Sequence, residues 1–385
     1  MSQSTPRSWG AVLALALAAF IFNTSEHAPI ALLSDIGTSF AMSHEAVGWM
    51  ITLYAWTVLL TSLPLMLLAR RIERRKLLIG VFLLFIVGQI VAGEATSFAM
   101  LMVGRLGVAL AHALFWSITA ALAVRVAPEG KARIALSLLS TGTALALILG
   151  LPVGRLIGQW FGWRTSFLAI GGAAALTLLW LAFTLPRLES RNAGSLRSLP
   201  LLWANAPLRL LYLSLVLIIA ADFTVYSYIE PFAAEVARLQ PEEITLFLLV
   251  TGGAGLLGSY AFGRWSERGG QRFAIGAAAI LLVCFLLIRA AAGQALVFTA
   301  LCIVWGAALM AFALAQQAST LRLARRSSDV AMSIFSSLFN LGIGAGAFIG
   351  GLTTHHLGLP TLGFVAAGLA VLGFAACWRQ KEERR

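Results

Sequence analysis

Residues 77–124 read LLIGVFLLFIVGQIVAGEATSFAMLMVGRLGVALAHALFWSITAALAV, two long apolar runs, 77–97 and 99–124, that follow one another almost without a break. Each run has the length that crosses a bilayer as an α-helix, roughly 20 residues. The whole chain of 385 residues is 59% hydrophobic and 11% charged, whereas a soluble domain carries about a quarter charged residues. So few charges cannot cover a water-soluble surface, and the sequence therefore predicts an all-α membrane protein.

Runs of the same kind recur along the chain. The first is too long and has the wrong flanks for a cleaved signal peptide, so we interpret it as a membrane span. We predict twelve spans near 9–34, 47–69, 77–97, 99–124, 134–157, 164–185, 208–232, 243–262, 273–292, 295–317, 330–352 and 360–378.

Lysine and arginine residues are concentrated in alternate loops between these spans. They gather in the tails and in every second loop, such as 70–76 and 264–272, and the loops between, such as 35–46 and 353–360, are almost free of them. This positive-inside pattern predicts that both termini lie in the cytoplasm. The net charge of +12 is thereby explained by orientation in a lipid bilayer, and we expect no nucleic-acid partner.

The first and second halves of the chain contain similar segments. MLLARRIERR at 66–75 resembles GRWSERGGQR at 263–272, displaced by 197 residues. ALS at 135–137 matches AMS at 331–333, and GLPVG at 150–154 matches GAFIG at 346–350, both displaced by 196. The sequence thus predicts a duplicated six-span unit with pseudo-two-fold symmetry.

The halves are predicted at 1–186 and 208–385, and the polar stretch 187–207 between them is rich in Pro, Gly, Ser and Arg, which is typical of a cytoplasmic linker. Parallel six-span repeats of this kind place a binding site near the bilayer midplane, between the halves.

The repeated loop resembles a family signature, Gly-x-x-x-Asp-Arg-x-Gly-Arg-Arg of the major facilitator superfamily. The resemblance implies that fold and a gate or loop role for matching positions, although the first half lacks the glycine and the acid. Arg105 matches the family's intramembrane arginine, and Gly142 to Gly158 resembles its antiporter signature. The matching loop residues are Arg71, Arg74, Arg75, Gly263, Glu267, Arg268 and Arg272.

A tighter resemblance covers nearly the whole chain. AAFIFNTSEHAPIALLSDI, ITLYAWTVLLTSLP, YSYIEPF and FNLGIGAG are similar in order and spacing to the bacterial sugar efflux transporters, in the drug:proton antiporter branch. That implies export of small sugars, such as arabinose and isopropyl thiogalactoside, from the cytoplasm across the bacterial inner membrane, coupled to proton entry. We expect a monomer.

Ionisable residues inside spans are costly and are therefore functional candidates. Glu26 is the first candidate for the proton carrier, because burial disfavours the charged form of a carboxyl group; the alternative is a hydrated carboxylate near the helix end. Asp222 competes for coupling or substrate contact. His112, near the middle of its span, can titrate near neutral pH. Arg105 can assist proton transfer or else extend outward along the helix.

A sugar site needs hydrogen-bonding groups beside apolar or aromatic walls. The candidates that offer these are Asn23, Glu26, Tyr54, His112, Trp116, Tyr226, Trp305, Gln316, Phe339 and Asn340.

Two other functions remain open. An exporter of drugs or amphipathic compounds would need a cavity dominated by aromatic and Met side chains, and a polytopic sensor or scaffold would need its intramembrane charges paired. The sequence has no HExxH, GxSxG or GxxxxGK[ST] motif, so we expect neither an enzyme nor a cofactor. The three cysteines lie in apolar runs, without the paired spacing of a metal site.

Overall fold

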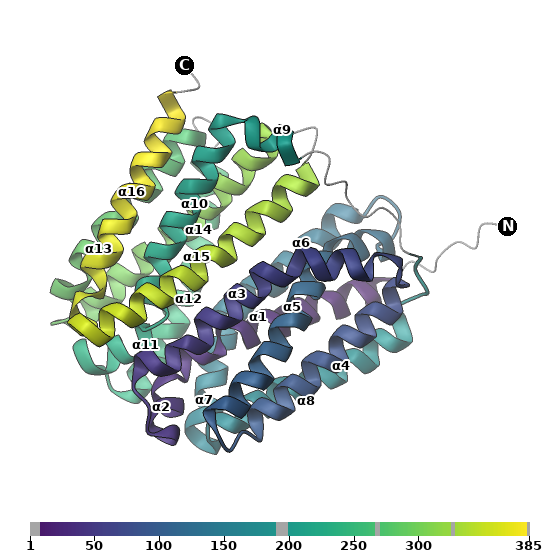
Figure 1. The fold of residues 1–385 in the computed structure, drawn as a ribbon, viewed down its shortest axis with the longest axis horizontal. Coiled ribbons are helices and arrows are strands. Elements are labelled where there is room, and N and C mark those ends of the chain that lie inside the picture. Colours follow the sequence, from purple (N-terminus) through teal and green to yellow (C-terminus); the bar gives the residue numbers. More distant parts are fainter. Residues whose placement is uncertain (1–7, 190–198, 266–269, 325–327, 383–385) are drawn as a thin grey trace. The chain divides into compact units, whose positions relative to one another are not determined.

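The structure is a computed structural model that describes residues 8–189, 199–265, 270–324 and 328–382. Every regular element in these ranges is helical (Figure 1). Twelve of the helices are long and apolar enough to cross a membrane. The prediction of an all-α membrane protein with twelve spans is therefore confirmed.

The first six spans, with their short connecting helices, are α1 (Trp9–Ala31), α2 (Leu33–Phe40), α3 (His44–Leu68), η1 (Ala69–Arg71), α4 (Arg74–Gly93), α5 (Phe98–Val126), α6 (Ala132–Leu145), η2 (Ala146–Gly150), α7 (Leu151–Phe161) and α8 (Trp163–Thr184). The fifth span is α6, η2 and α7 together. The remaining elements are α9 (Leu199–Ala204), α10 (Ala206–Tyr226), α11 (Ile229–Pro231), η4 (Phe232–Val236), α12 (Pro241–Trp265), α13 (Gly270–Ala291), α14 (Ala295–Leu323), α15 (Ser328–Leu357), η6 (Leu359–Thr361) and α16 (Leu362–Glu382).

Two compact units account for the packing of these helices. The first comprises the chain up to Asp35 and from Thr57 to Ala193, and the second comprises Ile36–Trp56 and the chain from Gly194 onward, so that α3 contributes to both. In the first unit α4 packs on α5 and α8, and α1 packs on α6 and α8. In the second, α10 packs on α15 and α16, and α14 packs on α12 and α13. The division of the sequence into halves at 1–186 and 208–385 remains a prediction.

Two predicted spans extend past the end of the helix that the structure shows. The first span was expected to reach residue 34, but α1 ends at Ala31, and α2 begins at Leu33. The seventh was expected to continue to 232, but α10 ends at Tyr226, and Pro231 follows in the separate turn α11. Pro231 has no N–H group for the carbonyl four residues earlier, so it cannot continue the regular hydrogen-bond ladder of α10.

Local hydrogen bonds shape the connections between spans. The interval predicted as a linker contains the short helix α9, and the Asn205 side chain then caps α10 by accepting a hydrogen bond from the Leu208 N–H at 3.2 Å. The fifth span contains a π-helical turn, Ala146–Gly150, between α6 and α7. Such a turn widens the hydrogen-bond ladder locally and is frequent at functional sites.

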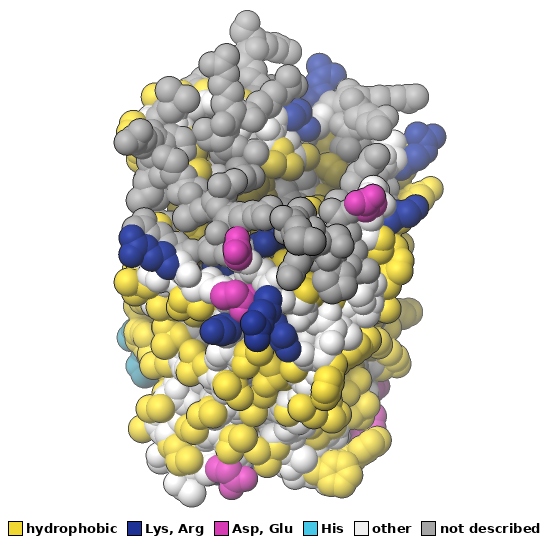
Figure 2. Space-filling view, turned by 90° about the vertical axis from the view of Figure 1, so that its right-hand side faces the viewer, with side chains coloured by type: hydrophobic (Ala, Val, Ile, Leu, Met, Phe, Trp, Pro, Cys, Tyr) yellow, Lys and Arg dark blue, Asp and Glu magenta, His cyan; other side chains and the backbone are white. Residues whose placement is uncertain are grey.

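The surface is that of a protein whose solvent is lipid. Large apolar side chains are widely exposed, among them Phe183 at 88% and Leu296 at 83%. Figure 2 shows hydrophobic side chains covering much of one face, with Lys and Arg side chains at a few separate places. In water this much exposed apolar area would drive aggregation, whereas in a bilayer it matches the surrounding acyl chains.

Candidate functional site

Glu26 and His112 lie together in the first unit. Oε2 of Glu26, on α1, is 3.6 Å from Nε2 of His112, on α5. The exposed fraction of the side chain is 14% for Glu26 and 4% for His112. The structure thus brings together two residues that the sequence singled out separately, and it places the carboxyl group largely out of solvent.

Two further polar side chains on α1, His27 and Asn23, make contacts in the same part of the helix. Nδ1 of His27 is 4.0 Å from Oε2 of Glu26 and 3.0 Å from the backbone oxygen of Asn23. A carbonyl oxygen can only accept, so Nδ1 of His27 carries the hydrogen of that contact. The buried amide of Asn23 in turn donates to the carbonyl of Thr143 on α6, at 3.3 Å.

Arg105 is held by the residue before Glu26. Because Pro29 lacks an N–H group, the carbonyl of Ser25 has no donor in the helical ladder. Arg105 Nη1 donates to that carbonyl at 3.0 Å and reaches the Ser25 hydroxyl at 3.2 Å. The arginine is 1% exposed, so it does not extend outward to the helix end. It joins α5 to α1 at the turn that carries Glu26.

Gln89 on α4 completes this network by donating to the hydroxyl of Ser25. Neither Gln89 nor Ser25 was a candidate from the sequence. The signal for Gln89 was its position as an amide in the middle of an apolar run, because a buried amide needs a partner in lipid. For Ser25 the signal was its place four residues before a proline.

Aromatic rings form the apolar wall of the same region. Phe22 stacks between Phe85 and Phe115 with ring centroids 4.1 Å from each. Trp116, a predicted substrate residue, lies with its ring centroid 6.0 Å from that of His112. The three phenylalanines are fully buried, so they belong to the packing of the first unit. Of the four rings, the indole of Trp116 lies nearest to His112.

A second acid is buried in the second unit. Asp222 on α10 is 1% exposed, and its Oδ1 accepts a hydrogen bond from Nε1 of Trp305 on α14 at 2.7 Å. The Trp305 ring also contacts Tyr226 and Phe285, edge to face, at centroid distances of 6.2 and 5.6 Å. Oδ2 of Asp222 has no hydrogen-bond partner among the described residues. Three predicted site residues, Asp222, Tyr226 and Trp305, thus form one cluster.

Other predicted residues of the second unit lie elsewhere. Gln316 is three helical turns beyond Trp305 on α14, about 16 Å at 1.5 Å per residue, and donates to the Ser214 hydroxyl at 2.5 Å. Asn340 on α15 donates to the carbonyl of Ser336, one turn earlier in the same helix, at 3.1 Å. Phe339 lies beside Phe335, and Tyr54 is buried in α3. Gln316 is thus too distant to share a small sugar with Asp222.

The loop signature contains an acid that the sequence comparison missed. Glu73 caps α4 by accepting from the N–H groups of Arg75 and Lys76, at 2.8 and 3.0 Å. It also accepts from the N–H of Leu188, after α8, at 2.7 Å. Burial raises the pKa of Glu73, but these three backbone donors outweigh it and leave the pKa below its ordinary value. The signal was an acid directly before the basic run of 74–76.

The structure places the predicted residues of the two signature loops in different helices. Arg75 donates to the carbonyl of Ala182 at 2.5 Å, and Arg71 ends η1. Arg74 and Arg272 lie in the first turns of α4 and α13, and Gly263 lies inside α12. Glu267 and Arg268 lie outside the described residues.

Two imidazole–carboxylate pairs meet at the start of α3. Nδ1 of His44 is 3.4 Å from Oε1 of Glu235 in η4, and Nδ1 of His355 in α15 is 3.2 Å from Oε1 of Glu45. These neighbouring residues therefore join α3 to two other elements of the second unit. The signals in the sequence were the adjacent His44 and Glu45 in a loop almost free of Lys and Arg, and the two histidines that end α15.

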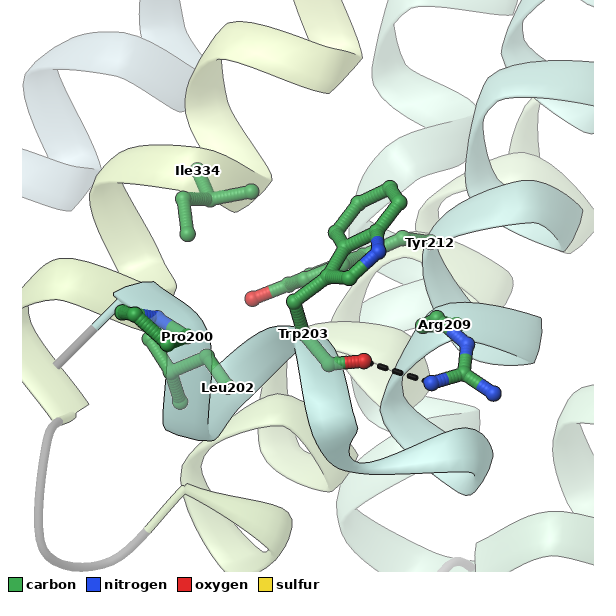
Figure 3. Close-up of a pocket in the computed structure, with 6 residues that line it drawn as sticks. All are labelled: Pro200, Leu202, Trp203, Arg209, Tyr212 and Ile334. Atoms are coloured by element: carbon green, nitrogen blue, oxygen red, sulfur yellow. Dashed lines mark hydrogen bonds between the residues drawn. The ribbon is translucent and has the colours of Figure 1, made fainter.

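A cavity of about 330 Å³ lies at the junction of α9 and α10. Its lining residues are Pro200, Leu202, Trp203, Arg209, Tyr212 and Ile334. Figure 3 shows the Tyr212 ring extending towards Pro200 and Ile334, and Arg209 Nη1 donates to the carbonyl of Trp203 at 2.6 Å. Tyr212 is ten residues before Asp222 on α10, about 15 Å along the helix. The cavity is therefore separate from the Asp222 cluster.

Comparisons with known proteins agree on one architecture. The Major Facilitator Superfamily family matches residues 14–329. A bacterial homologue of the human lysosomal transporter Spinster, inward-facing and occupied, is 17% identical over 98% of each chain with a TM-score of 0.77. Its unoccupied form is 17% identical over 96% of this chain and 97% of its own, with a TM-score of 0.71. A peptide transporter, POT, solved as a mutant with sulfate, is 14% identical over 98% of this chain and 97% of its own, with a TM-score of 0.79. At these identities the likeness shows the fold alone.

Proposed function

The chain belongs to the major facilitator superfamily, and from that premise we propose that it exports small neutral sugars in exchange for protons. The sugars are of the size of arabinose and isopropyl thiogalactoside, and the membrane is a bacterial inner membrane with both chain termini in the cytoplasm. The resemblance of nearly the whole sequence to sugar efflux transporters supports the substrate. The alternation of Lys and Arg between loops supports the orientation.

The observation that carries the proton coupling is the contact of Glu26 with His112. The carboxyl group of Glu26 is 14% exposed and its Oε2 is 3.6 Å from Nε2 of His112, so a small movement of either side chain would bring the two groups within reach for proton transfer. Glu26 is proposed as the proton carrier, with His112 as the group that exchanges the proton or stabilises the carboxylate. Arg105, bound to Ser25, is proposed to position the turn of α1 that presents Glu26.

The polar groups near each acid suit a neutral, hydroxylated substrate. In the first unit Asn23 lies three residues before Glu26 on α1 and the Trp116 ring lies 6.0 Å from the ring of His112, and in the second the groups are Tyr226 and Trp305. A sugar hydroxyl both donates and accepts, and the apolar face of a sugar ring packs on aromatic rings. The large phenylalanine stack of the first unit is fully buried, so it offers no open aromatic wall for amphipathic drugs.

The test is transport by purified protein in proteoliposomes with an imposed pH gradient and radiolabelled arabinose. We expect wild-type protein to move arabinose against its gradient. Glu26→Gln should lower this uphill transport at least about tenfold, equivalent to about 1.4 kcal/mol, because the amide cannot carry a proton. Exchange of sugar without a pH gradient should persist.

The matched control is Glu94→Gln, the same chemical change at the exposed residue that directly follows α4. This variant should transport like wild type. Normal uphill transport by Glu26→Gln would remove Glu26 from the mechanism. Failure of wild-type protein to move any small sugar would reject the substrate class.

A further inference from the structure

Glu26 and Asp222 occupy equivalent places in the duplicated sequence. Asp222 follows Glu26 by 196 residues, the same displacement that relates the repeated segments of the fifth and eleventh spans. Glu26 lies on α1, the first span of its set of six, and Asp222 lies on α10, the seventh span overall and thus the first of the second set. Each repeat therefore carries one acid at the same position of its first span.

The partner of each acid comes from an equivalent helix. His112 lies on α5, the fourth span, and Trp305 lies on α14, the tenth span and thus the fourth of the second set. The position equivalent to His112 is Ala308, three residues after Trp305. Residues three apart share a helix face, so both ring nitrogens approach their acid from the same side of the repeat. The distances are 3.6 Å for Glu26 and 2.7 Å for Asp222.

No described cationic side chain faces Asp222 from the helices packed around it. These are α14, α15 and α16, whose described Arg and His side chains are Arg322, His355, His356 and Arg379, each at the end of its helix. The other described titratable groups on these helices are the thiols of Cys302 and Cys377. Arg322 is 17 residues beyond Trp305, about 25 Å along α14, and on α10 itself Arg209 is 13 residues before Asp222, about 20 Å. The nearest described titratable groups in sequence are Tyr226, one turn away on α10, and Tyr228, and the buried acid Glu230 follows in α11.

This environment favours a neutral, proton-bearing carboxyl group. An isolated carboxylate in an apolar interior is costly, and the group neutralises instead. The indole N–H of Trp305 can only donate, so it occupies Oδ1 as an acceptor. Oδ2, which has no described partner, is then the oxygen that binds the proton.

We propose that Asp222 is a second proton-binding group, so that each repeat carries its own carboxyl and one transport cycle exchanges two protons for one sugar. The stoichiometry rests on the proposed sugar:proton exchange, whereas proton binding at Asp222 does not. The two parts are therefore tested separately.

Proton binding is tested by infrared pH titration of the purified protein in detergent, with no sugar present. We expect Asp222→Asn to remove one titrating carboxyl band and Glu26→Gln to remove another. Glu230→Gln, the control at a second buried acid of the same unit, should leave the Asp222 band in place. An unchanged spectrum for Asp222→Asn would overturn the proposal. Trp305→Phe keeps the carboxyl and removes its donor, so it must shift the same band, even where Asp222→Asn does not fold.

Stoichiometry is tested by the sugar gradient that a fixed proton gradient can balance in proteoliposomes at zero membrane potential. With two protons per sugar, a tenfold proton gradient balances about a hundredfold sugar gradient, and Asp222→Asn should balance only about tenfold. A wild-type balance near tenfold would overturn the two-proton cycle. If wild-type protein moves no sugar, the proposed function fails, and the infrared titration still decides whether Asp222 binds a proton.

Discussion

At the scale of single residues, Arg105 compensates for a hydrogen bond that Pro29 removes. The carbonyl of Ser25 loses its helical donor to the proline and gains the guanidinium of Arg105. The hydroxyl oxygen of Ser25 accepts hydrogen bonds from both Gln89 and Arg105. A planar group with several donors suits this double contact better than the single ammonium of a lysine.

We therefore predict that Arg105→Met destabilises the protein. The variant leaves the buried carbonyl of Ser25 without a partner, which costs about 1–3 kcal/mol. Thermal unfolding of the purified protein in detergent should show a lower midpoint, and Arg105→Lys should restore part of the loss. Arg289→Met, at an exposed position of α13, is the control and should unfold like wild type. Equal midpoints for Arg105→Met and Arg289→Met would contradict the bridging role.

Sequence reasoning found the acids but not their partners. Glu26, Asp222 and Arg105 stand out because ionisable residues are rare in apolar runs. Which group each one meets depends on how the helices are rotated about their axes, and the even hydrophobicity of these spans leaves that rotation undetermined. The pairing of Asp222 with Trp305, and of Arg105 with Ser25, therefore came only from the structure.

At the scale of elements, Glu73 ties the start of α4 to the segment after α8. Its carboxylate accepts three backbone N–H groups, two in its own helix and one from Leu188. The carbonyl of Leu188 accepts from Arg74 in return, at 2.9 Å. One acid in a basic loop thus satisfies a helix end and fixes a neighbouring chain segment.

The lowered pKa of Glu73 predicts a pH-dependent contribution to stability. The folded state holds the carboxylate more tightly than the unfolded state does, so the contribution is complete above the ordinary pKa of 4.5. It is lost as the pH falls through the lower pKa of the folded state, because protonation then removes the acceptor. Glu73→Gln should therefore unfold at a lower temperature than wild type at pH 7.

The same comparison at lower pH provides the check. The difference between the two proteins should shrink as the pH falls below 4.5 and should reach its smallest value at the acid end of the titration. A difference that stays constant from neutral to acid pH would show that the carboxylate charge of Glu73 is irrelevant to stability.

Helix positions followed from the sequence more closely than helix interruptions did. The spans are properties of windows of about 20 residues, so scattered substitutions do not hide them. The π-helical turn at 146–150 and the break after Tyr226 are changes of backbone hydrogen bonding over a few residues. The hydropathy of the sequence reveals neither of these interruptions.

Glu73, the acid of the first loop, was not predicted, because the comparison of the two repeats placed Arg70 at the acidic position of the signature.

At the scale of the whole molecule, the orientation in the membrane is open to direct test. The three native cysteines are buried, so a membrane-impermeant maleimide should label wild-type protein weakly. Thr38→Cys on α2 is exposed in a loop region poor in Lys and Arg, and Arg264→Cys is exposed near the end of α12. With both termini in the cytoplasm, intact cells should label Thr38→Cys, and Arg264→Cys should be labelled only after permeabilisation. The reverse result would invert the predicted topology.

The two acids have partners of different chemistry at different positions of their helices, because Trp305 lies three residues before the position equivalent to His112. An imidazole can accept a hydrogen as well as donate one, whereas an indole nitrogen has no free lone pair. Under the proposed exchange, His112 could therefore take a proton from Glu26, whereas Trp305 could not take one from Asp222. The two sites would then not be interchangeable, and Asp222 would need a proton acceptor other than its indole neighbour.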